Sequence, residues 1–225
     1  MFGLGPLGIL IALLFLASLG LQQYLRSVYT RNNAVRNARN LTGADVARLL
    51  LDQAGLQQVP VERMSGQLTD HYDPRAKAVR LSELNFDQPS VSALAVAAHE
   101  VGHAVQDKEN YGVLALRAGL LPVLSIGSSI APWLIMAGFI LNLPPLLWLG
   151  IFFFAGVVVF HLVTLPVEFD ASRRALNNLE SQNLLSSAEM GGARQVLTAA
   201  ALTYVAAFAI ALAQLLNLLL QARRR

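Results

Sequence analysis

The stretch AGLLPVLSIGSSIAPWLIMAGFILNLPPLLWLGIFFFAGVVVFHLVTLPV, residues 118–167, decides the fold of this 225-residue chain because it carries no charged side chain over fifty positions. A membrane-spanning helix needs about 20 mostly apolar residues, so the run is long enough for two. Asn142-Leu143-Pro144-Pro145 lies near its middle, and these residue types end a helix and form a turn. The run therefore predicts two spans, 118–141 and 146–165, joined as a hairpin.

Two further uncharged runs flank this hairpin in the sequence. Residues 1–25 and 195–222 carry no charge, and each run is long enough for one span. They predict spans at 3–21 and 196–220. The first run lacks the basic start of a cleaved signal peptide, and its basic residues follow the span, so we interpret it as an uncleaved anchor. The chain is predicted to be a mostly α integral membrane protein with four transmembrane helices.

The composition narrows the class of protein further. Hydrophobic residues make up 55% of the chain and charged residues only 14%, against roughly a quarter in an average soluble domain. The chain has no cysteine, which excludes a disulfide framework, a thiolate metal site and a cysteine nucleophile. Its net charge of +3 comes from three arginines at the C-terminus. The neutral remainder lacks the basic face of a nucleic-acid-binding protein, so we expect no nucleic-acid partner.

The basic residues also predict an orientation in the membrane. Lys and Arg near the ends of spans favour the cytoplasm. Nine of them lie near span ends on the side of the large polar segments: Arg26, Arg31, Arg36, Arg39, Lys108, Arg117, Arg173, Arg174 and Arg194. The basic C-terminal tail argues for the opposite orientation. On balance the sequence predicts a multi-pass protein of the cell membrane with its polar segments on the cytoplasmic side.

The polar segment between the first span and the hairpin has the pattern of a folded domain. Thr42-Gly43-Ala44-Asp45 precedes an apolar periodic stretch and predicts a capped helix, because Thr accepts a backbone hydrogen bond and an acid suits the first turn. Residues 59–81 alternate apolar and polar side chains between turn residues, which predicts two or three short strands. A second helix is predicted from Ser90 to Asp107.

That second helix contains His99-Glu100-Val101-Gly102-His103. Residues four apart lie on one face of a helix, so both imidazoles can approach one ion. Glu100 lies one step round the helix, where it can take a proton from a water on the ion. This is the H-E-x-x-H arrangement of zinc-dependent hydrolases. It predicts one catalytic Zn²⁺ with His99 and His103 as ligands and Glu100 as the general base.

A catalytic zinc site usually has three protein ligands and one open position. The metzincin pattern would supply a third His six residues after His103, but Gln106 and Glu109 stand at the positions that this pattern requires to be Gly and His. The hairpin returns the chain to the side of the two histidines, and the first acid after it is Glu168. Glu168 is therefore the expected third ligand. Asp170 is the competitor, or an acceptor for a ligand imidazole N–H, or an ion-pair partner for Arg174.

Three stretches of the sequence together resemble a known family. They are Ala97–Gln106, Leu68–Arg75 and Pro166–Ser172, and they resemble the YugP-like bacterial membrane zinc metallopeptidases over nearly the whole chain. The resemblance implies a zinc endopeptidase of the gluzincin type and a small α+β zincin-like catalytic domain built around the HExxH helix.

The resemblance also implies roles for individual residues. His99, His103 and Glu168 would be the zinc ligands and Glu100 the catalytic base. The chain is more distantly similar to the HtpX and CAAX membrane proteases, in which an aspartate four residues after the ligand glutamate supports a zinc-binding His. Here that position is Ser172, so Asp170 or Ser172 is expected to orient a ligand imidazole.

Other polar side chains are candidates for stabilising the oxyanion of the reaction, a role that His, Tyr or Arg can fill. His71 and Tyr72 come first, because they lie in a predicted strand or turn within a motif shared with the family; Tyr111 and Arg173 are the others. A strand edge between residues 59 and 81 is expected to hold an extended substrate. His161, inside the third span, is expected to be a packed, hydrogen-bonded histidine.

The predicted organisation has five segments and one leading function. The segments are an anchor at 1–25, a zincin-like polar domain at 26–117, the transmembrane hairpin at 118–166, a third-ligand helical segment at 167–194, and a last transmembrane helix with a basic tail at 195–225. The predicted function is a membrane-bound zinc endopeptidase that acts at the membrane surface on peptides or membrane-associated proteins, in contact with membrane lipid. The alternatives are a site-2-type intramembrane protease and a non-catalytic zinc-binding membrane protein.

Overall fold

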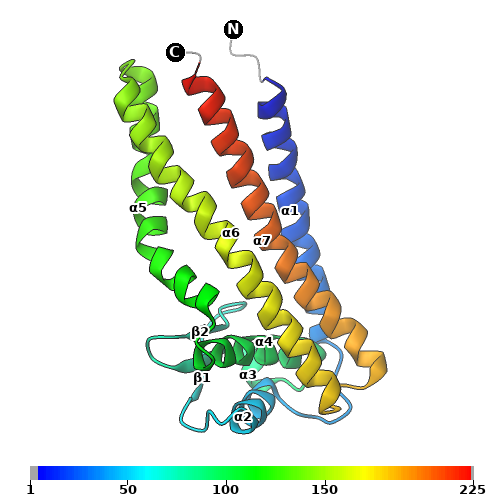
Figure 1. Cartoon of the computed structure of the whole chain (residues 1–225). Coiled ribbons are helices and arrows are strands. Elements are labelled where there is room, and N and C mark those ends of the chain that lie inside the picture. Colours follow the sequence, from blue (N-terminus) through cyan, green and yellow to red (C-terminus); the bar gives the residue numbers. More distant parts are fainter. Residues whose placement is uncertain (1–4, 224–225) are drawn as a thin grey trace. The chain divides into compact units, whose positions relative to one another are not determined.

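The computed structural model describes residues 5–223 of the chain. This part is mostly helical and contains one small sheet, as Figure 1 shows. The elements are α1 (Pro6–Asn33), α2 (Gly43–Gln53), β1 (Val61–Met64), β2 (His71–Asp73), β3 (Ala78–Ser82), α3 (Glu83–Asp87), α4 (Val91–Lys108), α5 (Gly112–Ile140), α6 (Pro144–Ser181) and α7 (Ser187–Ala222).

Four helices of the described part are long and apolar enough to cross a membrane, namely α1, α5, α6 and α7. This confirms the predicted number of spans. Each helix is longer than the predicted span, and α1, α6 and α7 continue into polar residues. Large apolar side chains such as Leu16, Trp133 and Phe152 are more than half exposed, as expected for surfaces that face lipid. Residues 3 and 4 of the first predicted span, and Arg224 and Arg225 of the basic tail, lie outside the described residues.

The prolines of α6 behave differently at its start and in its interior. Helix α6 begins at Pro144, so Pro144 and Pro145 occupy its first turn, where a missing N–H leaves no helical bond unmade. Pro166 lies inside α6. Helix α6 therefore continues past residue 165, where the predicted span ends. A proline within an apolar helix is tolerated where neighbouring groups satisfy the freed carbonyl, and α6 continues through it to Ser181.

The chain divides into two compact units. One comprises residues 1–21, 115–166 and 203–225, and the other comprises residues 22–114 and 167–202. In the first unit the α5–α6 hairpin is packed through small residues. A Cβ added to Gly138 would lie 2.6 Å from the backbone nitrogen of Leu147, and one added to Gly127 would lie 2.7 Å from the carbonyl oxygen of Phe153. The two helix backbones therefore touch, which is typical of packed membrane helices.

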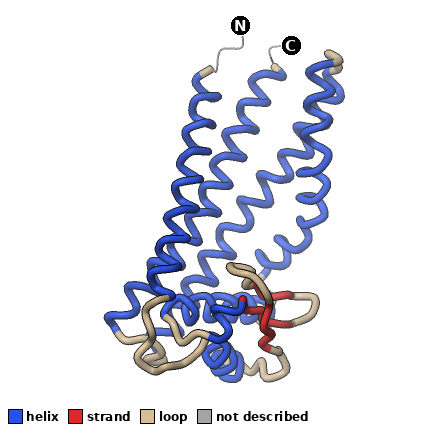
Figure 2. The backbone as a smooth tube through the Cα atoms, turned by 180° about the vertical axis from the view of Figure 1, so that it is seen from behind, coloured by secondary structure: helices blue, strands red, loops and turns tan. Residues whose placement is uncertain are grey.

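The second unit has its own core and contains the sheet. Apolar side chains of α2, α4 and β3 pack with those of the 167–202 segment; the core includes Val46, Leu50, Leu51, Val79, Leu81, Leu94, Val101, Ala175, Leu179, Leu184 and Leu197. The strand order is β1-β3-β2, shown in red in Figure 2. Strand β1 is parallel to β3, while β2 is antiparallel to it. Strand β2 is therefore an edge strand.

Several local predictions for this unit are confirmed. The side chain of Thr42 accepts from the backbone nitrogen of Asp45 in a complete capping box at the start of α2. The side chain of Ser90 caps α4 in the same manner by accepting from the backbone nitrogen of Ala93. All three strands lie in or just beyond the predicted 59–81 region. The division of the chain into five functional segments stays a prediction.

Candidate metal centre

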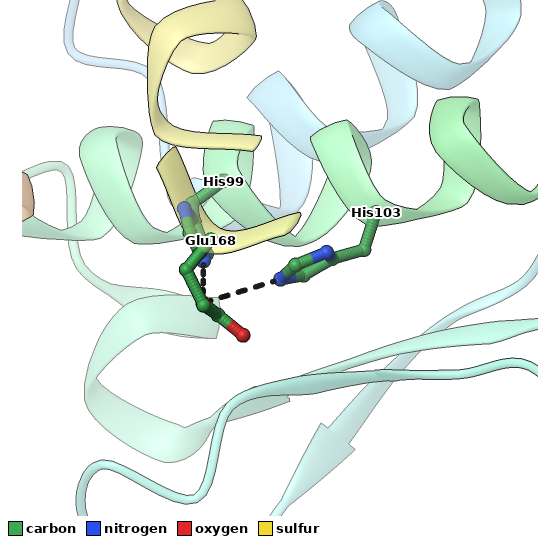
Figure 3. A group of neighbouring side chains, drawn as sticks. All are labelled: His99, His103 and Glu168. Carbon is green, nitrogen blue, oxygen red and sulfur yellow. Dashed lines mark ion pairs between the residues drawn. The ribbon is translucent and has the colours of Figure 1, made fainter. Parts of the chain in front are cut away.

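Two imidazoles and one carboxylate meet within the second unit. His99 and His103 come from α4 and Glu168 from α6, and their side chains point toward one another in Figure 3. The Oε2 atom of Glu168 lies 3.3 Å from Nε2 of His99 and 3.7 Å from Nε2 of His103. One donor atom from each residue lies within 4.8 Å of the others. All three side chains are largely buried.

The close approach of α6 to α4 depends on a glycine inside the HExxH motif. A Cβ added to Gly102 would lie 2.9 Å from the carbonyl oxygen of Ala171 and 3.2 Å from its Cα. No ordinary side chain fits such a gap, so the helix backbones touch at this point. Glu168 lies about one helical turn before Ala171, and the contact therefore carries its carboxylate to the two histidines.

The ring of His103 is held by a buried amide. Its Nδ1 lies 3.0 Å from Oε1 of Gln106. The Nε2 group of Gln106 donates to the carbonyl oxygen of Val167 and to Oδ2 of Asp170, both at 2.9 Å. Gln106 is fully buried, and these two acceptors orient its amide so that the oxygen faces His103. We refer to His99, His103 and Glu168 as the metal group. The proton of His103 is thus on Nδ1, and the lone pair of its Nε2 is directed at the other two members of this group.

The ring of His99 is held by a hydroxyl group. Its Nδ1 lies 3.2 Å from Oγ of Ser172, which is only half-buried. A hydroxyl can accept from Nδ1–H, which is compatible with the same tautomer as in His103. Of the two predicted orienting residues, Ser172 contacts a ligand imidazole directly, while Asp170 acts on the other imidazole through Gln106.

Asp170 also links the metal group to basic side chains. It accepts a hydrogen bond from Nε of Arg174 at 2.6 Å and another from Arg173. Arg174 in turn lies 2.8 Å from Glu109, just after α4. The predicted pair between Asp170 and Arg174 is therefore present. It belongs to a chain of contacts that joins the end of α4 to α6.

Glu100 is held by the main chain of the edge strand. The backbone nitrogen of Tyr72 in β2 donates to Oε2 of Glu100 at 2.9 Å. Glu100 is buried, and this burial raises the pKa of its carboxyl group above the usual value. A raised pKa suits a group that must accept a proton near neutral pH. A bound dication would lower the pKa of this carboxyl group.

The side chains of His71 and Tyr72 have their own partners. Nδ1 of His71 lies 2.8 Å from the carbonyl oxygen of Thr69, and the Tyr72 hydroxyl donates to Asp107 at 2.6 Å. Burial and the Asp107 contact raise the pKa of Tyr72, so its hydroxyl keeps its proton. The structure thus brings the main chain of Tyr72, rather than its hydroxyl, to Glu100.

The remaining predicted residues lie away from the three donors or have other contacts. Arg173 is bound to Asp170 and its side chain is mostly exposed. The ring of His161 packs edge-to-face on Phe160. The predicted packing of His161 is therefore present, but its side chain makes no hydrogen bond to any residue among 5–223.

The donor set fits a zinc ion. Zinc in proteins takes imidazole nitrogens and carboxylate oxygens at about 2.0–2.2 Å in tetrahedral geometry, which sets its ligand atoms about 3.4 Å apart. The distances from Oε2 of Glu168 to the two imidazole nitrogens, 3.3 and 3.7 Å, bracket this value. Ligand histidines in zinc proteins also donate their second N–H to an acceptor; here Oε1 of Gln106 lies beside Nδ1 of His103, and the Ser172 hydroxyl lies beside Nδ1 of His99.

Sequence comparisons agree with this geometry. The family described as "Putative neutral zinc metallopeptidase" matches residues 7–223. The "Putative membrane protease YugP" of Bacillus subtilis (strain 168) is 46% identical over 208 residues, which cover 91% of this chain and 92% of that protein. No solved structure matches the chain. The chain therefore belongs to this neutral zinc metallopeptidase family. Its predicted resemblance to YugP-like membrane zinc metallopeptidases is confirmed.

Proposed function

We propose that the chain is a membrane-bound, zinc-dependent endopeptidase whose single Zn²⁺ is held by His99, His103 and Glu168. The observation that carries this proposal is the meeting of their donor atoms within 4.8 Å. Both imidazoles already have a partner at Nδ1, so each offers Nε2 to the ion. Family membership supports the zinc and the peptidase class.

The proposed chemistry assigns Glu100 the role of general base. When bound, zinc supplies a Lewis acid that activates water and polarises the scissile carbonyl. Oε2 of Glu100 is fixed by the Tyr72 N–H, and its Oε1 makes no hydrogen bond to another described residue. Glu100 takes a proton from the attacking water at this second oxygen and delivers it to the leaving amine.

His71 and Tyr72 are proposed to stabilise the oxyanion from β2. Nδ1–H of His71 is already directed at a carbonyl oxygen, so its Nε2 donates only when the ring is protonated. The Tyr72 hydroxyl must leave Asp107 to donate elsewhere. As an edge strand next to Glu100, β2 is also the proposed support for an extended substrate, through backbone pairing. This arrangement of edge strand and HExxH helix supports a zincin-like catalytic domain of the gluzincin type.

The proposed substrates are peptides or membrane-associated proteins that reach the site at the cytoplasmic surface of the cell membrane. The positive residues near the span ends support this side. A site-2-type intramembrane protease is less well supported, because α4 is not among the four membrane-length apolar helices of residues 5–223. A non-catalytic zinc clamp usually has four closed protein ligands, and the group found here has three members.

Replacing Glu100 with Gln tests the proposal. The variant is expected to keep its zinc and to lose roughly 10²–10⁴-fold in peptide cleavage, the usual contribution of a general base. Zinc content and hydrolysis of a casein-derived peptide are measured on the purified full-length protein. Glu83→Gln removes an acid that pairs with Arg63 and does not belong to the metal group, and it is the matched control. Undiminished cleavage by Glu100→Gln would refute the assigned base, and no cleavage by the zinc-loaded unmodified protein would refute the enzyme.

A further inference from the structure

A groove of about 320 Å³ lies between α6 and α7 in the second unit. The two helices run side by side in opposite directions, as Figure 1 shows for the yellow and orange ribbons. Positions three or four apart share one face of a helix, and each helix presents one such face to the groove. The walls include Phe169, Arg173 and Glu180 of α6, and Arg194, Thr198 and Leu202 of α7.

Two arginines give the groove a positive rim. Arg194 is exposed and makes no ion pair with another residue of the described part. The side chain of Arg173 contacts Asp170 but is 71% exposed. Glu180 is the one acid of the lining, and it lies seven positions beyond Arg173, about 10 Å farther along α6. The carboxylate of Asp170 offsets the charge of Arg173, so the uncompensated positive charge of the rim is that of Arg194.

The groove has an apolar end and a basic end. Phe169 and Leu202 are both more than 40% exposed and lie toward the uncharged runs of their helices. The run of α6 ends at Val167, and that of α7 begins at Gln195, directly after Arg194. Arg173 lies about 9 Å beyond Val167 along the helix. The headgroup layer of a bilayer is about 5–8 Å thick on each side, and long arginine side chains reach across such a distance.

We infer that this groove is a binding site for an anionic phospholipid. The phosphate lies between the guanidinium groups of Arg173 and Arg194, and a segment of one acyl chain lies on Phe169 and Leu202. Basic pockets between membrane helices recognise anionic headgroups in this manner, and guanidinium groups bind phosphate through paired hydrogen bonds. The volume of about 320 Å³ is at the lower end of ligand pockets, roughly 300–1,000 Å³, and so accommodates part of a lipid.

Charge and location together favour lipid over an acidic peptide as the occupant. Both walls belong to helices that are long and apolar enough to cross a membrane. Lipid is therefore the surrounding solvent of these helices. The order of the lining, from exposed apolar side chains to arginines, follows the order of an anionic lipid from acyl chain to headgroup.

The test measures lipid retention by the zinc-loaded full-length protein. The protein is exchanged into micelles that contain equal amounts of phosphatidylglycerol and phosphatidylcholine, and bound lipid is quantified by native mass spectrometry. Phosphatidylglycerol is expected to be retained in preference. Arg194→Gln should weaken its binding about fivefold, the usual effect of one basic residue at a lipid surface. Thr198→Trp, at an exposed position of the lining, should fill the groove and remove retention.

Arg26→Gln is the matched control. Arg26 is an exposed arginine directly after the uncharged run of α1, outside the groove, and its replacement should leave retention unchanged. Equal retention of both lipids, or equal weakening by Arg26→Gln and Arg194→Gln, would overturn the proposal. So would an acidic apolar peptide that loses affinity in Arg194→Gln while phosphatidylglycerol binding stays the same, because the groove would then be a peptide site.

Discussion

The two histidines of the metal group differ in how their rings are held. His103 is fixed by Gln106, a fully buried amide with two acceptors of its own on α6. His99 is fixed by the hydroxyl of Ser172, a single rotatable group at the longer distance of 3.2 Å. The His103 side of the site is therefore a rigid network, whereas the His99 side depends on one contact. The difference shows where the geometry of the metal group is determined and where it can adjust.

Both supports nevertheless depend on the same helix, α6, because Ser172 belongs to it and Gln106 of α4 is oriented by it. Residues Val167 to Ser172 of α6 supply the carboxylate, the carbonyl and carboxylate that orient Gln106, and the hydroxyl that faces His99. A shift of α6 relative to α4 would disturb all of these contacts at once. Variants that remove one contact at a time separate the contributions of the two sides.

Glu168→Ala breaks both sides together and should have the largest effect. It removes the one donor that faces both imidazoles. Loss of an orienting residue around a metal costs about 10–100-fold in affinity, and loss of a ligand should exceed the upper end of this range. Zinc affinity is measured by competition with a chelator, with Glu83→Ala as control. Normal affinity in Glu168→Ala would move the third ligand to another residue, Asp170 first.

Gln106→Met should have the next largest effect and tests the His103 side. It keeps a similar volume but removes the acceptor for Nδ1 and the donor to Asp170. Zinc affinity should fall about 10–100-fold. The free energy of unfolding should fall by about 1–3 kcal/mol, because buried polar partners lose a hydrogen bond. Chelator competition and thermal unfolding measure the two effects. Gln88→Met replaces an exposed glutamine and should change neither.

Ser172→Ala tests the His99 side and should have the smallest effect. The half-buried hydroxyl is exchangeable with water, so zinc affinity should fall by about tenfold or less, the low end of the range for orienting residues. Ser172→Thr keeps the hydroxyl and should restore most of the affinity. A loss as large as that in Gln106→Met would show that the two sides are held equally firmly, contrary to the comparison.

The proximity of the three candidate donors could be predicted because two kinds of constraint are visible in sequence. The spacing of His99 and His103 places both on one helix face, and an uncharged hairpin must return the chain to the side from which it left. Together these two constraints singled out Glu168, which lies beside both imidazoles. The proximity of these three side chains could therefore be expected from the sequence, whereas their roles are a proposal.

Other contacts of the site could not be predicted from residue types. Gln106 follows His103 by three positions and so shares its helix face. This spacing is visible in the sequence, where Gln106 served only to exclude the metzincin pattern. The contact of Glu100 uses the backbone N–H of Tyr72, a group that every residue but proline has. The continuation of α6 through Pro166 depends on how the freed carbonyl is satisfied, which sequence alone does not give.

The backbone contact at Gly102 has a consequence for the order in which the protein matures. Gln106 and Val167, which meet in the finished site, are 61 positions apart in the chain. A ribosome-bound chain therefore carries both imidazoles well before the carboxylate has been synthesised. The three candidate donor side chains come together only after α6 has docked on α4, so their assembly requires that synthesis has passed the hairpin.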